Sequence, residues 1–524
     1  MRDAELWRSL AAASRSPRAT ALLFCWFALM FVGTAQHGQV SADVVATYLP
    51  AWSLGQLQTA DLDAFHRGTM FLREVDGHWR SDRFPGAILP AVPAYALLGG
   101  GTPSIGPSLL TAALMSALTV ALIHRTLLRI TGAGTALAAT LVFGLGTPVW
   151  TVSADALWTH TSTQLGLAAV LYGLAAGRPW ISGLGMVLSA AARPHTAIAA
   201  AVLGIGAFLR DRRLAPGLWL AAGALGGFAV VLWWTAATLG EATLFPGSYA
   251  GRGGDVLTAG NAAGEEAAAF GWPVNLAGFL VSPERGVLVL CPFVVPCVVG
   301  MRRAWRTAPS FAKDAAIAAV LYTFAQLAVN GFGGGWGFFS FRHGLEGLTL
   351  ATPMLVLGGV AAARTWLGSR AIVLLVGYAV GVHTLGAVFY VAYDEGPVWW
   401  TKYQPYELAT QGAWTLVPSI AVGVLVAGFC AVMVRADTLG RAGGFGDSRG
   451  RGVGRNPGMG PDDDAVQTRA HLLPEEERTG SADPTAQAEA ILTESEERVQ
   501  EPTADDPRTP GDDGFEHRRS DEIV

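Results

Sequence analysis

The sequence predicts an all-α, polytopic membrane protein with about 11 to 13 spanning helices. Three observations predict this class. Of the 524 residues, 51% are hydrophobic and only 15% are charged, and the mean hydropathy is +0.37, which is too apolar for a soluble globular chain of this length. Long apolar runs recur between residues 19 and 434, and arginines gather at alternate ends of those runs.

The elements follow one another in a simple order. Residues 1–18 form an arginine-bearing leader, which we expect to be retained because no small-residue cleavage site follows the first apolar run. Residues 19–434 form the transmembrane domain. Within it, the runs counted as spans are residues 19–35, 108–128, 135–149, 161–176, 181–192, 196–209, 217–239, 286–299, 315–329, 345–362, 371–390 and 413–434.

Arginine placement predicts the orientation, because arginines in short loops are retained on the cytoplasmic side. Both termini are therefore expected to be cytoplasmic. The longer opposite segments are expected outside, and they are the first outer loop (36–84), residues 150–160, the surroundings of Arg193, and residues 240–285, 330–343 and 392–412. Arginine strongly outnumbers lysine, which is typical of a high-G+C bacterium and predicts a bacterial inner (plasma) membrane location.

Three further segments complete the predicted architecture. The first outer loop is expected to be helical. Residues 85–99 are apolar but short and broken by prolines, so they are expected to lie at the membrane interface. Residues 435–524 are rich in Gly, Pro, Asp and Glu, and we expect a disordered acidic cytoplasmic tail that either recruits a protein partner or only solvates the C-terminus.

The cysteines indicate no metal or redox chemistry. All four fall inside apolar runs without the paired spacing of a zinc site or disulfide framework, and they are Cys25, Cys291, Cys297 and Cys430. We predict no metal site and no cofactor. The lipid bilayer is an expected partner and nucleic acid is not.

One acidic residue stands out by position. Asp43 follows the first apolar run directly, at the head of a charged loop that reaches Arg83. An acid fixed at the membrane surface either caps an interfacial helix or acts as a base toward a hydroxyl group.

Several other outer residues are candidates, each with an ordinary alternative. Arg342 either grips a phosphate through two guanidinium nitrogens or pairs with Glu346, and Arg83 either joins it or anchors residues 85–99. Arg193 interrupts an apolar stretch beside His195, where a charge usually faces a cavity or a partner. His160 either contacts substrate or anchors its helix at the membrane interface. Glu284 and Arg285 either belong to the site or only pair with each other.

These motifs, in order, resemble a known group. They are Asp43-Val-Val-Ala-Thr-Tyr48, Asp82-Arg83-Phe-Pro85-Gly86, Gly146-Thr-Pro148, Leu157-Trp158-Thr-His160, Arg193-Pro194, Ser282-Pro283-Glu284-Arg285-Gly286, and Gly333-Gly-Gly-Trp336 leading to Arg342 and Glu346. The chain resembles the GT-C superfamily of integral membrane glycosyltransferases, which includes protein O-mannosyltransferases and lipid A aminoarabinose transferases.

The resemblance implies catalysis on the extracytoplasmic face, a polyprenyl-phosphate-linked sugar as donor, and Asp43 as catalytic base. Arg342, Arg83, Arg193, His195, His160, Glu284 and Arg285 are the expected substrate-binding residues. The chain departs from the mannosyltransferases, because Val44 replaces the acid that follows the base there, and this favours a metal-independent site. It also has Ser340-Phe341 where many relatives have Gly-Pro before the arginine.

We therefore predict a membrane glycosyltransferase that moves a sugar, with inversion, to a hydroxyl of an envelope glycan, lipid or protein. Two alternatives share the same helix pattern. A transporter or lipid flippase would need internal symmetry and ionisable residues near the membrane centre. A non-catalytic scaffold would use the acidic tail but leave the ordered outer motifs unexplained.

Overall fold

The computed structural model describes residues 7, 9, 11–35, 41–66, 71–246, 265–334, 337–390 and 403–450. Of residues 265–271, 329 and 438–450 it describes the backbone alone. The described chain is almost entirely helical, which confirms the predicted fold class. The expected disordered tail falls largely on residues 451–524, outside the described residues.

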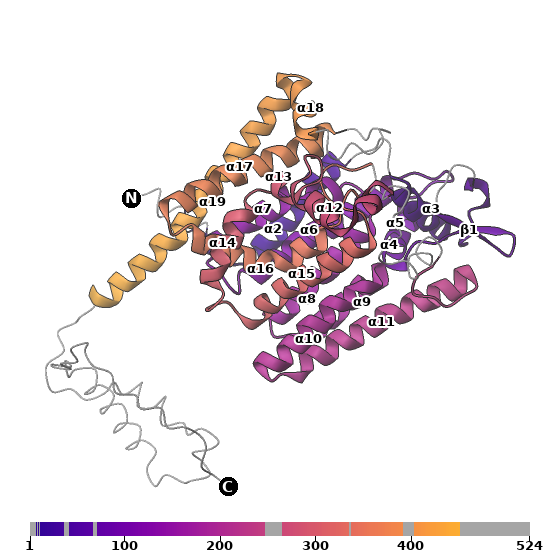
Figure 1. Cartoon of the computed structure of the whole chain (residues 1–524), viewed down its shortest axis with the longest axis horizontal. Coiled ribbons are helices and arrows are strands. Elements are labelled where there is room, and N and C mark those ends of the chain that lie inside the picture. The colour runs from indigo at the N-terminus through magenta and orange to yellow at the C-terminus, as the bar shows by residue number, and fades with distance from the viewer. Residues whose placement is uncertain are drawn as a thin grey trace, which may run out of the picture. The chain divides into compact units, whose positions relative to one another are not determined.

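The helices run in sequence through one bundle (Figure 1). They are α2 (Pro17–Thr34), α3 (Ala42–Gln56), α4 (Pro85–Ile88), α5 (Val92–Leu98), α6 (Gly106–Leu127), α7 (Ala133–Leu145), α8 (Thr159–Ala175), α9 (Pro179–Ala192), α10 (Ala197–Asp211), α11 (Leu214–Leu239), α12 (Glu265–Val281), α13 (Val287–Leu290), α14 (Val294–Ala304), α15 (Ser310–Val329), α16 (Leu345–Ala362), α17 (Trp366–Phe389), α18 (Gln404–Thr410) and α19 (Ala413–Gly450). Short helical turns occur at Asp63–Phe65, Leu89–Ala91, Val149–Ser153 and Pro194–Thr196.

Seven helices among the described residues are long and apolar enough to cross a membrane, which makes the chain a multi-pass membrane protein. They are α2, α6, α11, α15, α16, α17 and the first part of α19. The count is lower than the sequence predicted because α7, α8, α9 and α10 have only 13, 17, 14 and 15 residues. Helices that short reach across the apolar layer only with help from neighbouring protein.

One expected span is replaced by two short helices. Residues 286–299 form α13 and the start of α14, with Cys291, Pro292 and Phe293 between them. Proline lacks an amide proton and cannot continue the hydrogen-bond ladder, so Pro292 accounts for the break. Helix α12, in contrast, lies inside a segment for which the sequence predicted only an outer loop.

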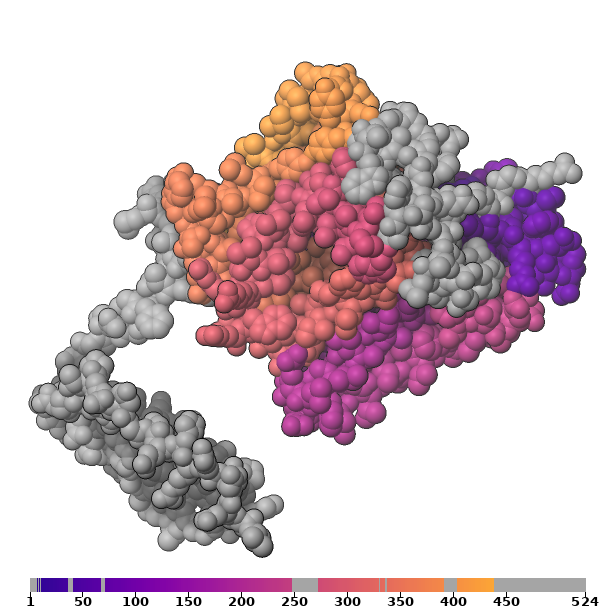
Figure 2. Space-filling view, in the orientation of Figure 1, coloured from indigo at the N-terminus to yellow at the C-terminus, as the bar shows by residue number. Residues whose placement is uncertain are grey.

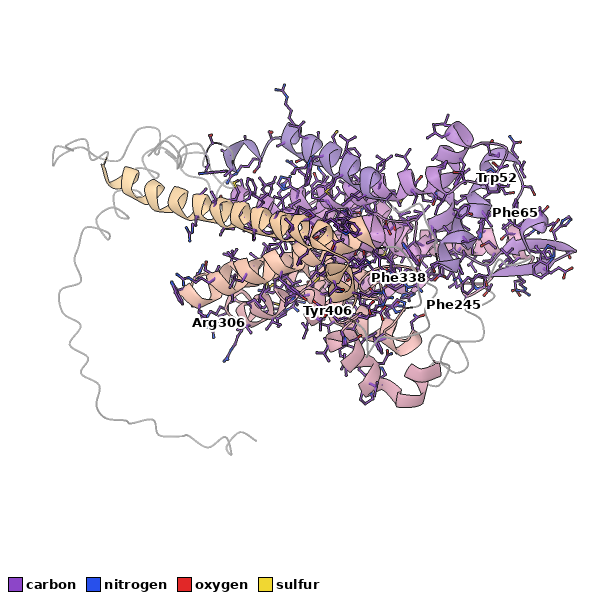
Figure 3. All side chains as sticks on the ribbon, turned by 90° about the horizontal axis from the view of Figure 1, so that it is seen from above. Trp52, Phe65, Phe245, Arg306, Phe338 and Tyr406 are labelled. Atoms are coloured by element: carbon purple, nitrogen blue, oxygen red, sulfur yellow. The ribbon has the colours of Figure 1, made fainter. Side chains whose placement is uncertain are left out.

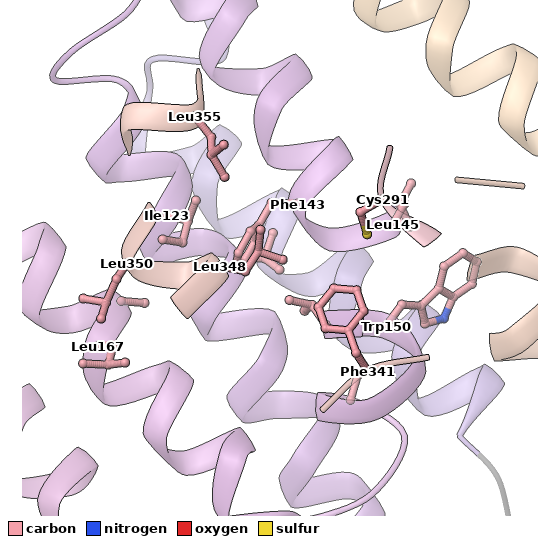
Figure 4. Close-up of a cluster of buried hydrophobic side chains, with 14 of the residues drawn as sticks. Ile123, Phe143, Leu145, Trp150, Leu167, Cys291, Phe341, Leu348, Leu350 and Leu355 are labelled. Carbon is pink, nitrogen blue, oxygen red and sulfur yellow. The ribbon is translucent and has the colours of Figure 1, made fainter. Parts of the chain in front are cut away.

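Helix α9 packs between α8 and α11, while α16 packs against α14, α15 and α8 (Figure 1). Buried apolar side chains from α6, α7, α8 and α16 meet in the core, among them Ile123, Phe143, Leu167 and Leu350 (Figure 4). On α11, large apolar side chains such as Leu218 and Trp233 are exposed instead, as expected of a lipid-facing helix.

The first outer segment contains a β-hairpin that the sequence analysis did not predict. Strands β1 (Leu72–Val75) and β2 (His78–Ser81) pair antiparallel, and both turn residues have positive φ, 54° at Asp76 and 81° at Gly77. Asp-Gly is the preferred pair for such a two-residue turn, so the expectation of a purely helical loop missed a local signal. The hairpin contacts the end of α11, where Arg80 donates to the carbonyl of Thr238 at 3.0 Å, and Arg73 pairs with Glu241 just after this helix. Figure 2 shows the indigo segment beside magenta α11.

The proline-rich segment 85–99 does not form a span. It folds into α4, a short turn and α5, and its location at the membrane interface stays a prediction. Its first half is buried in the protein. Gly86 makes this possible, because a Cβ there would lie 2.3 Å from the backbone nitrogen of Ala192. The chain after Arg83 is therefore pressed against the end of α9, just before Arg193.

Helix α19 continues past residue 434 to Gly450, so the start of the expected tail is helical. Asp437 belongs to this continuation, and its carboxylate accepts hydrogen bonds from the backbone amides of Gly134 (3.0 Å) and Thr135 (2.7 Å). These amides lie in the first turn of α7, where an anion is stabilised by the helix dipole.

Arg306 lies at one end of the bundle and Trp52 and Phe65 of the first outer segment lie at the other, with Phe338 between them (Figure 3). Which side of the membrane each end faces stays a prediction.

Candidate active site

Asp43 lies in the first turn of α3, immediately after the first spanning helix. Ser41 caps this helix, and its hydroxyl accepts a hydrogen bond from the backbone amide of Asp43 at 3.4 Å. A carboxylate in the first helical turn is stabilised by the helix dipole. The local sequence thus provides both the helix start and a favourable place for a negative charge.

Two arginines from distant parts of the chain hold this carboxylate. Arg83 Nη2 lies 3.1 Å from Oδ1 of Asp43, and Arg342 Nη1 donates to Oδ2 at 2.7 Å. The Arg83 side chain is only 3% exposed and that of Arg342 14%, whereas Asp43 keeps 23%. We call Asp43, Arg83 and Arg342 the Asp43 triad. It brings together three of the residues that the sequence singled out.

The two guanidinium groups decide the protonation state of Asp43. Burial on its own raises the pKa of the Asp43 carboxyl, but the charges of Arg83 and Arg342 outweigh burial and hold that pKa well below its usual range. Asp43 is therefore ionised at neutral pH. A carboxylate tied to two cations is also a weak base for as long as both cations stay bound to it.

Hydrogen bonds from the hairpin explain how Arg83 reaches Asp43. The Ser81 hydroxyl donates to the carbonyl of Ala46 in α3 (2.6 Å) and accepts from the backbone amide of Arg83 (3.2 Å). The guanidinium then stacks on the Phe71 ring, 3.6 Å from its centroid. Arg83 is thus held on α3 by short-range contacts and does not anchor residues 85–99 at the headgroups.

Arg342 is delivered by a tight loop, residues 337–342. Gly337 has φ of +79°, and a Cβ at this position would lie 2.8 Å from the backbone nitrogen of Ser41, so only glycine allows this approach. The Arg342 guanidinium lies over the ring of Trp158, 4.8 Å from its centroid. The alternative that Arg342 pairs with Glu346 is wrong, because Arg342 pairs with Asp43.

Glu284 and Arg285 pair with each other at 2.9 Å, and Arg285 also holds the loop that carries Arg342. Arg285 Nη1 donates to the carbonyls of Phe338 (2.8 Å) and Ser340 (2.7 Å), and its guanidinium lies 4.1 Å from the centroid of the Phe338 ring. Ser340 has φ of +75°, which is uncommon for a residue with a side chain. These bonds stabilise a strained turn directly before Arg342.

We expect Arg285→Met to loosen this loop. Two buried carbonyls and Glu284 would lose a charged donor, at a cost of about 1.5 to 3 kcal/mol for each bond. Hydrogen exchange of the amides of residues 338–342 should accelerate at least tenfold, while α6 keeps its protection. Arg306→Met, a change at an exposed arginine, should alter neither region. Equal protection of the loop in both variants would contradict a positioning role for Arg285.

A second group of polar side chains lies buried behind the triad, and we call it the Glu346 cluster. Its members come from α8, the turn after α9, α15 and α16, and they are His160, Arg193, His195, Tyr322, Gln326 and Glu346. Glu346 is 0% exposed and its Oε1 lies 2.7 Å from Nδ1 of His160. Arg193 Nη1 lies 2.7 Å from Nε2 of His160 and 3.6 Å from the same Glu346 oxygen.

The histidines of this cluster are neutral. Burial, together with the charges of Arg193 and Arg342, holds the pKa of His160 well below its ordinary value. Burial and Arg193 lower the pKa of His195 to about 3. Arg193 Nη1 lies 2.8 Å from Nδ1 and 2.7 Å from Nε2, so this arginine faces both ring nitrogens of the neutral His160, while Nδ1 also contacts Glu346.

Gln326 links the two halves of the cluster. Its Oε1 accepts from Arg193 Nη2 at 2.6 Å and lies 2.8 Å from Nε2 of His195, which in turn is 3.0 Å from the Tyr322 hydroxyl. The structure therefore brings Arg193, His195 and His160 together. The sequence placed only Arg193 and His195 side by side. Glu284 and Arg285 are bonded to each other and to the 337–342 loop, and no hydrogen bond or ion pair given for them joins this cluster.

Sequence reasoning missed the roles of Glu346, Gln326 and Tyr322. Glu346 opens the apolar run 345–362, and an ionisable residue in such a run is by default a candidate functional residue, so this signal was available. Gln326 and Tyr322 carry no comparable signal. Among the described residues, no group of three or more His, Cys, Asp or Glu side chains is placed to hold a metal ion. Metal independence stays a prediction.

The chain is similar to ArnT. One structure, ArnT from Cupriavidus metallidurans bound to undecaprenyl phosphate, has 15% sequence identity and a TM-score of 0.47, with 91% of this chain and 88% of ArnT covered. The apo state of the same ArnT gives 15% identity and a TM-score of 0.43, covering 90% of this chain and 87% of ArnT.

ArnT is a lipid A aminoarabinose transferase, a member of the group that the sequence motifs resemble. No family model matches the chain, and no curated protein matches it.

Proposed function

We propose that this protein is a membrane glycosyltransferase that moves a sugar from a polyprenyl-phosphate donor to an acceptor hydroxyl on the outer face. The observation that carries the proposal is the Asp43 triad, a carboxylate in the first turn of α3 that is held between two guanidiniums. A base beside two cations is the combination that displacement of a phosphate by a hydroxyl requires.

Arg342 and Arg83 are the proposed phosphate ligands. A guanidinium stays charged at all relevant pH values and can donate two hydrogen bonds to phosphate oxygens. Nε of Arg342 is buried and lacks a hydrogen-bond partner among the described residues, so this arginine keeps a free donor while it binds Asp43. The aromatic rings of Trp158 and Phe338 fix the guanidinium plane.

Asp43 is the proposed base. The acceptor oxygen attacks the anomeric carbon, the bond from that carbon to the phosphate oxygen breaks, and the electron pair leaves with the polyprenyl phosphate. Asp43 takes the hydroxyl proton. A single displacement of this kind inverts the anomeric carbon.

The electrostatics of the triad link binding to basicity. Without donor, Arg83 and Arg342 keep the pKa of Asp43 low and the carboxylate weakly basic. A phosphate bound to the same guanidiniums adds negative charge beside Asp43, which raises its affinity for a proton. The base therefore becomes effective once the donor is in place. We propose an envelope glycan, lipid or protein hydroxyl as acceptor.

The test is binding of undecaprenyl phosphate to the purified full-length protein, followed by transfer from a panel of labelled undecaprenyl-phosphate sugars into an envelope extract. Arg342→Ala should weaken lipid binding about tenfold to a hundredfold, because it removes a charged hydrogen-bonding pair. Arg129→Ala removes an exposed arginine in the turn after α6, outside the Asp43 triad, and this variant should bind the lipid normally.

Three outcomes would contradict the proposal. Lipid movement across vesicles without sugar transfer would favour the transporter or flippase, whose buried ionisable residues would then be the Glu346 cluster. Equal lipid binding by the Arg342→Ala and Arg129→Ala variants would remove the triad as the phosphate site. A scaffold would show neither binding nor transfer.

A further inference from the structure

The Glu346 cluster, together with Gln164 one helical turn after His160, contains buried hydrogen-bonding atoms that the described protein groups do not satisfy. Oε2 of Glu346, Nε2 of Gln326 and Oε1 of Gln164 are each buried and have no hydrogen-bond partner among the described residues. All three residues are at most 1% exposed. A buried polar atom without a partner costs about 1 to 3 kcal/mol, so three of them around one cluster indicate a ligand-binding role.

These atoms belong to neighbouring side chains. Gln164 lies one helical turn after His160 on α8, and its Nε2 donates to the hydroxyl of Thr349 at 2.9 Å. Thr349 lies one turn after Glu346 on α16. Gln326 reaches the group from α15 through Arg193. Three helices thus present open polar atoms to one region of the bundle.

The donor or acceptor character of these three unsatisfied atoms indicates which class of ligand could bind them. Glu346 and Gln164 offer acceptors, whereas Gln326 offers a donor. Arg193 lies 3.6 Å from Glu346 and offsets its charge, and His160 is neutral, so the cluster suits neither an anion nor an isolated cation. A hydroxyl group donates and accepts at once. A ring with several hydroxyls offers donors to Glu346 and Gln164 and acceptors to Gln326.

The cluster adjoins the Asp43 triad through two short stretches of chain. Trp158 stacks with Arg342 and lies two residues before His160, while Arg342 itself lies four residues before Glu346. Asp43 and Arg342 are both close enough to His160 to influence its protonation. A ligand with its phosphate at the triad would therefore carry its sugar toward the cluster.

We propose that the Glu346 cluster binds the hydroxyls of the donor sugar and determines which sugar is accepted, with Glu346 as the principal specificity residue. This inference rests on the proposed function. Arg193 and His160 act as positioning residues, because they orient the Glu346 carboxylate so that Oε2 stays available. Gln326 and Gln164 contact further hydroxyls of the same ring.

The experiment compares binding of undecaprenyl phosphate, an undecaprenyl-phosphate hexose, and analogues of that hexose lacking one hydroxyl each. Glu346→Gln keeps the shape of the side chain and an Oε1 acceptor for His160, but it replaces the open acceptor by a donor. We expect unchanged affinity for undecaprenyl phosphate and a tenfold to hundredfold loss of affinity for the glycosylated lipid. The unmodified protein should bind one deoxy analogue more weakly than the full hexose. Glu346→Gln should not lower the affinity for that analogue any further.

A control and a second test variant separate this inference from the proposed function. Glu74→Gln, at an exposed hairpin carboxylate, should keep the full discrimination between hydroxylated and deoxy donors. Gln164→Met preserves volume without a charge change, and it should show a smaller loss confined to the glycosylated lipid. It provides the same test if Glu346→Gln fails to fold.

Full hydroxyl discrimination in Glu346→Gln and Gln164→Met would overturn the inference and leave the proposed function intact. Weaker binding of undecaprenyl phosphate itself would also overturn it, since the cluster would then act on the phosphate or the fold. If the unmodified protein bound neither lipid, the proposed function would fail first and the inference with it.

Discussion

Asp43→Asn is expected to lower the rate of sugar transfer at saturating donor by about 10²- to 10⁴-fold, which is the usual contribution of a general base. Asparagine keeps the size of the side chain and its place in the first turn of α3, but it cannot take the acceptor proton. Binding of undecaprenyl phosphate should persist, because Arg83 and Arg342 are released from an anion. The measurement is kcat and lipid affinity for the folded variant in the same detergent.

Asp63→Asn is the matched control. Asp63 is an outer carboxylate of the same loop, exposed and paired with His78 at 2.8 Å, and it lies outside the triad. Its replacement should leave kcat unchanged. Near-normal transfer by Asp43→Asn would exclude Asp43 as the base and leave it as a ligand of the two arginines.

The base should also leave a signature in the pH profile. The pKa of Asp43 in the donor-free protein lies below the ordinary value of 3.8, so the carboxylate stays ionised above that pH and kcat/KM should show no acid limb from it there. With phosphate bound, the pKa rises and kcat should decline at a higher pH than kcat/KM as the medium is acidified. In Asp43→Asn this limb should be missing from kcat.

Arg193→Leu should destabilise the folded protein by about 3 to 5 kcal/mol, the usual cost of removing one partner from a buried ion pair. The change removes donors to His160 and Gln326 and leaves the fully buried Glu346 carboxylate without its cation. Chemical unfolding of the detergent-solubilised protein, monitored by tryptophan fluorescence, measures the effect.

The double variant Arg193→Leu/Glu346→Leu should regain much of this loss, because no uncompensated charge remains in the bundle. Arg129→Leu, at an exposed site, should stay within about 0.5 kcal/mol of the unmodified protein. If Arg193→Leu were no worse than Arg129→Leu, the Glu346 cluster would not be a buried charge network.

The identity of the triad partners shows why the site could be predicted only in part. Asp43 was identifiable from its position, since it follows an apolar run at the membrane exit, and Arg342 and Arg83 from their chemistry. Their mutual contacts depend on loops that bring residues 43, 83 and 342 together, and no local pattern encodes such distances. The sequence therefore left pairing of Arg342 with Glu346 open, although Glu346 turns instead toward His160 and Arg193.

By itself, the sequence determined the membrane class, the main apolar helices, and the concentration of candidate residues at helix ends, because hydrophobicity and charge act locally along the chain. Tertiary structure alone decided which distant side chains meet, namely that Asp43 lies between Arg83 and Arg342 and that Glu346 is the centre of a buried network. These outcomes depend on which helix faces meet in the bundle. A buried polar side chain takes whatever partner the packing brings to it, so its role becomes visible only when the helices are assembled.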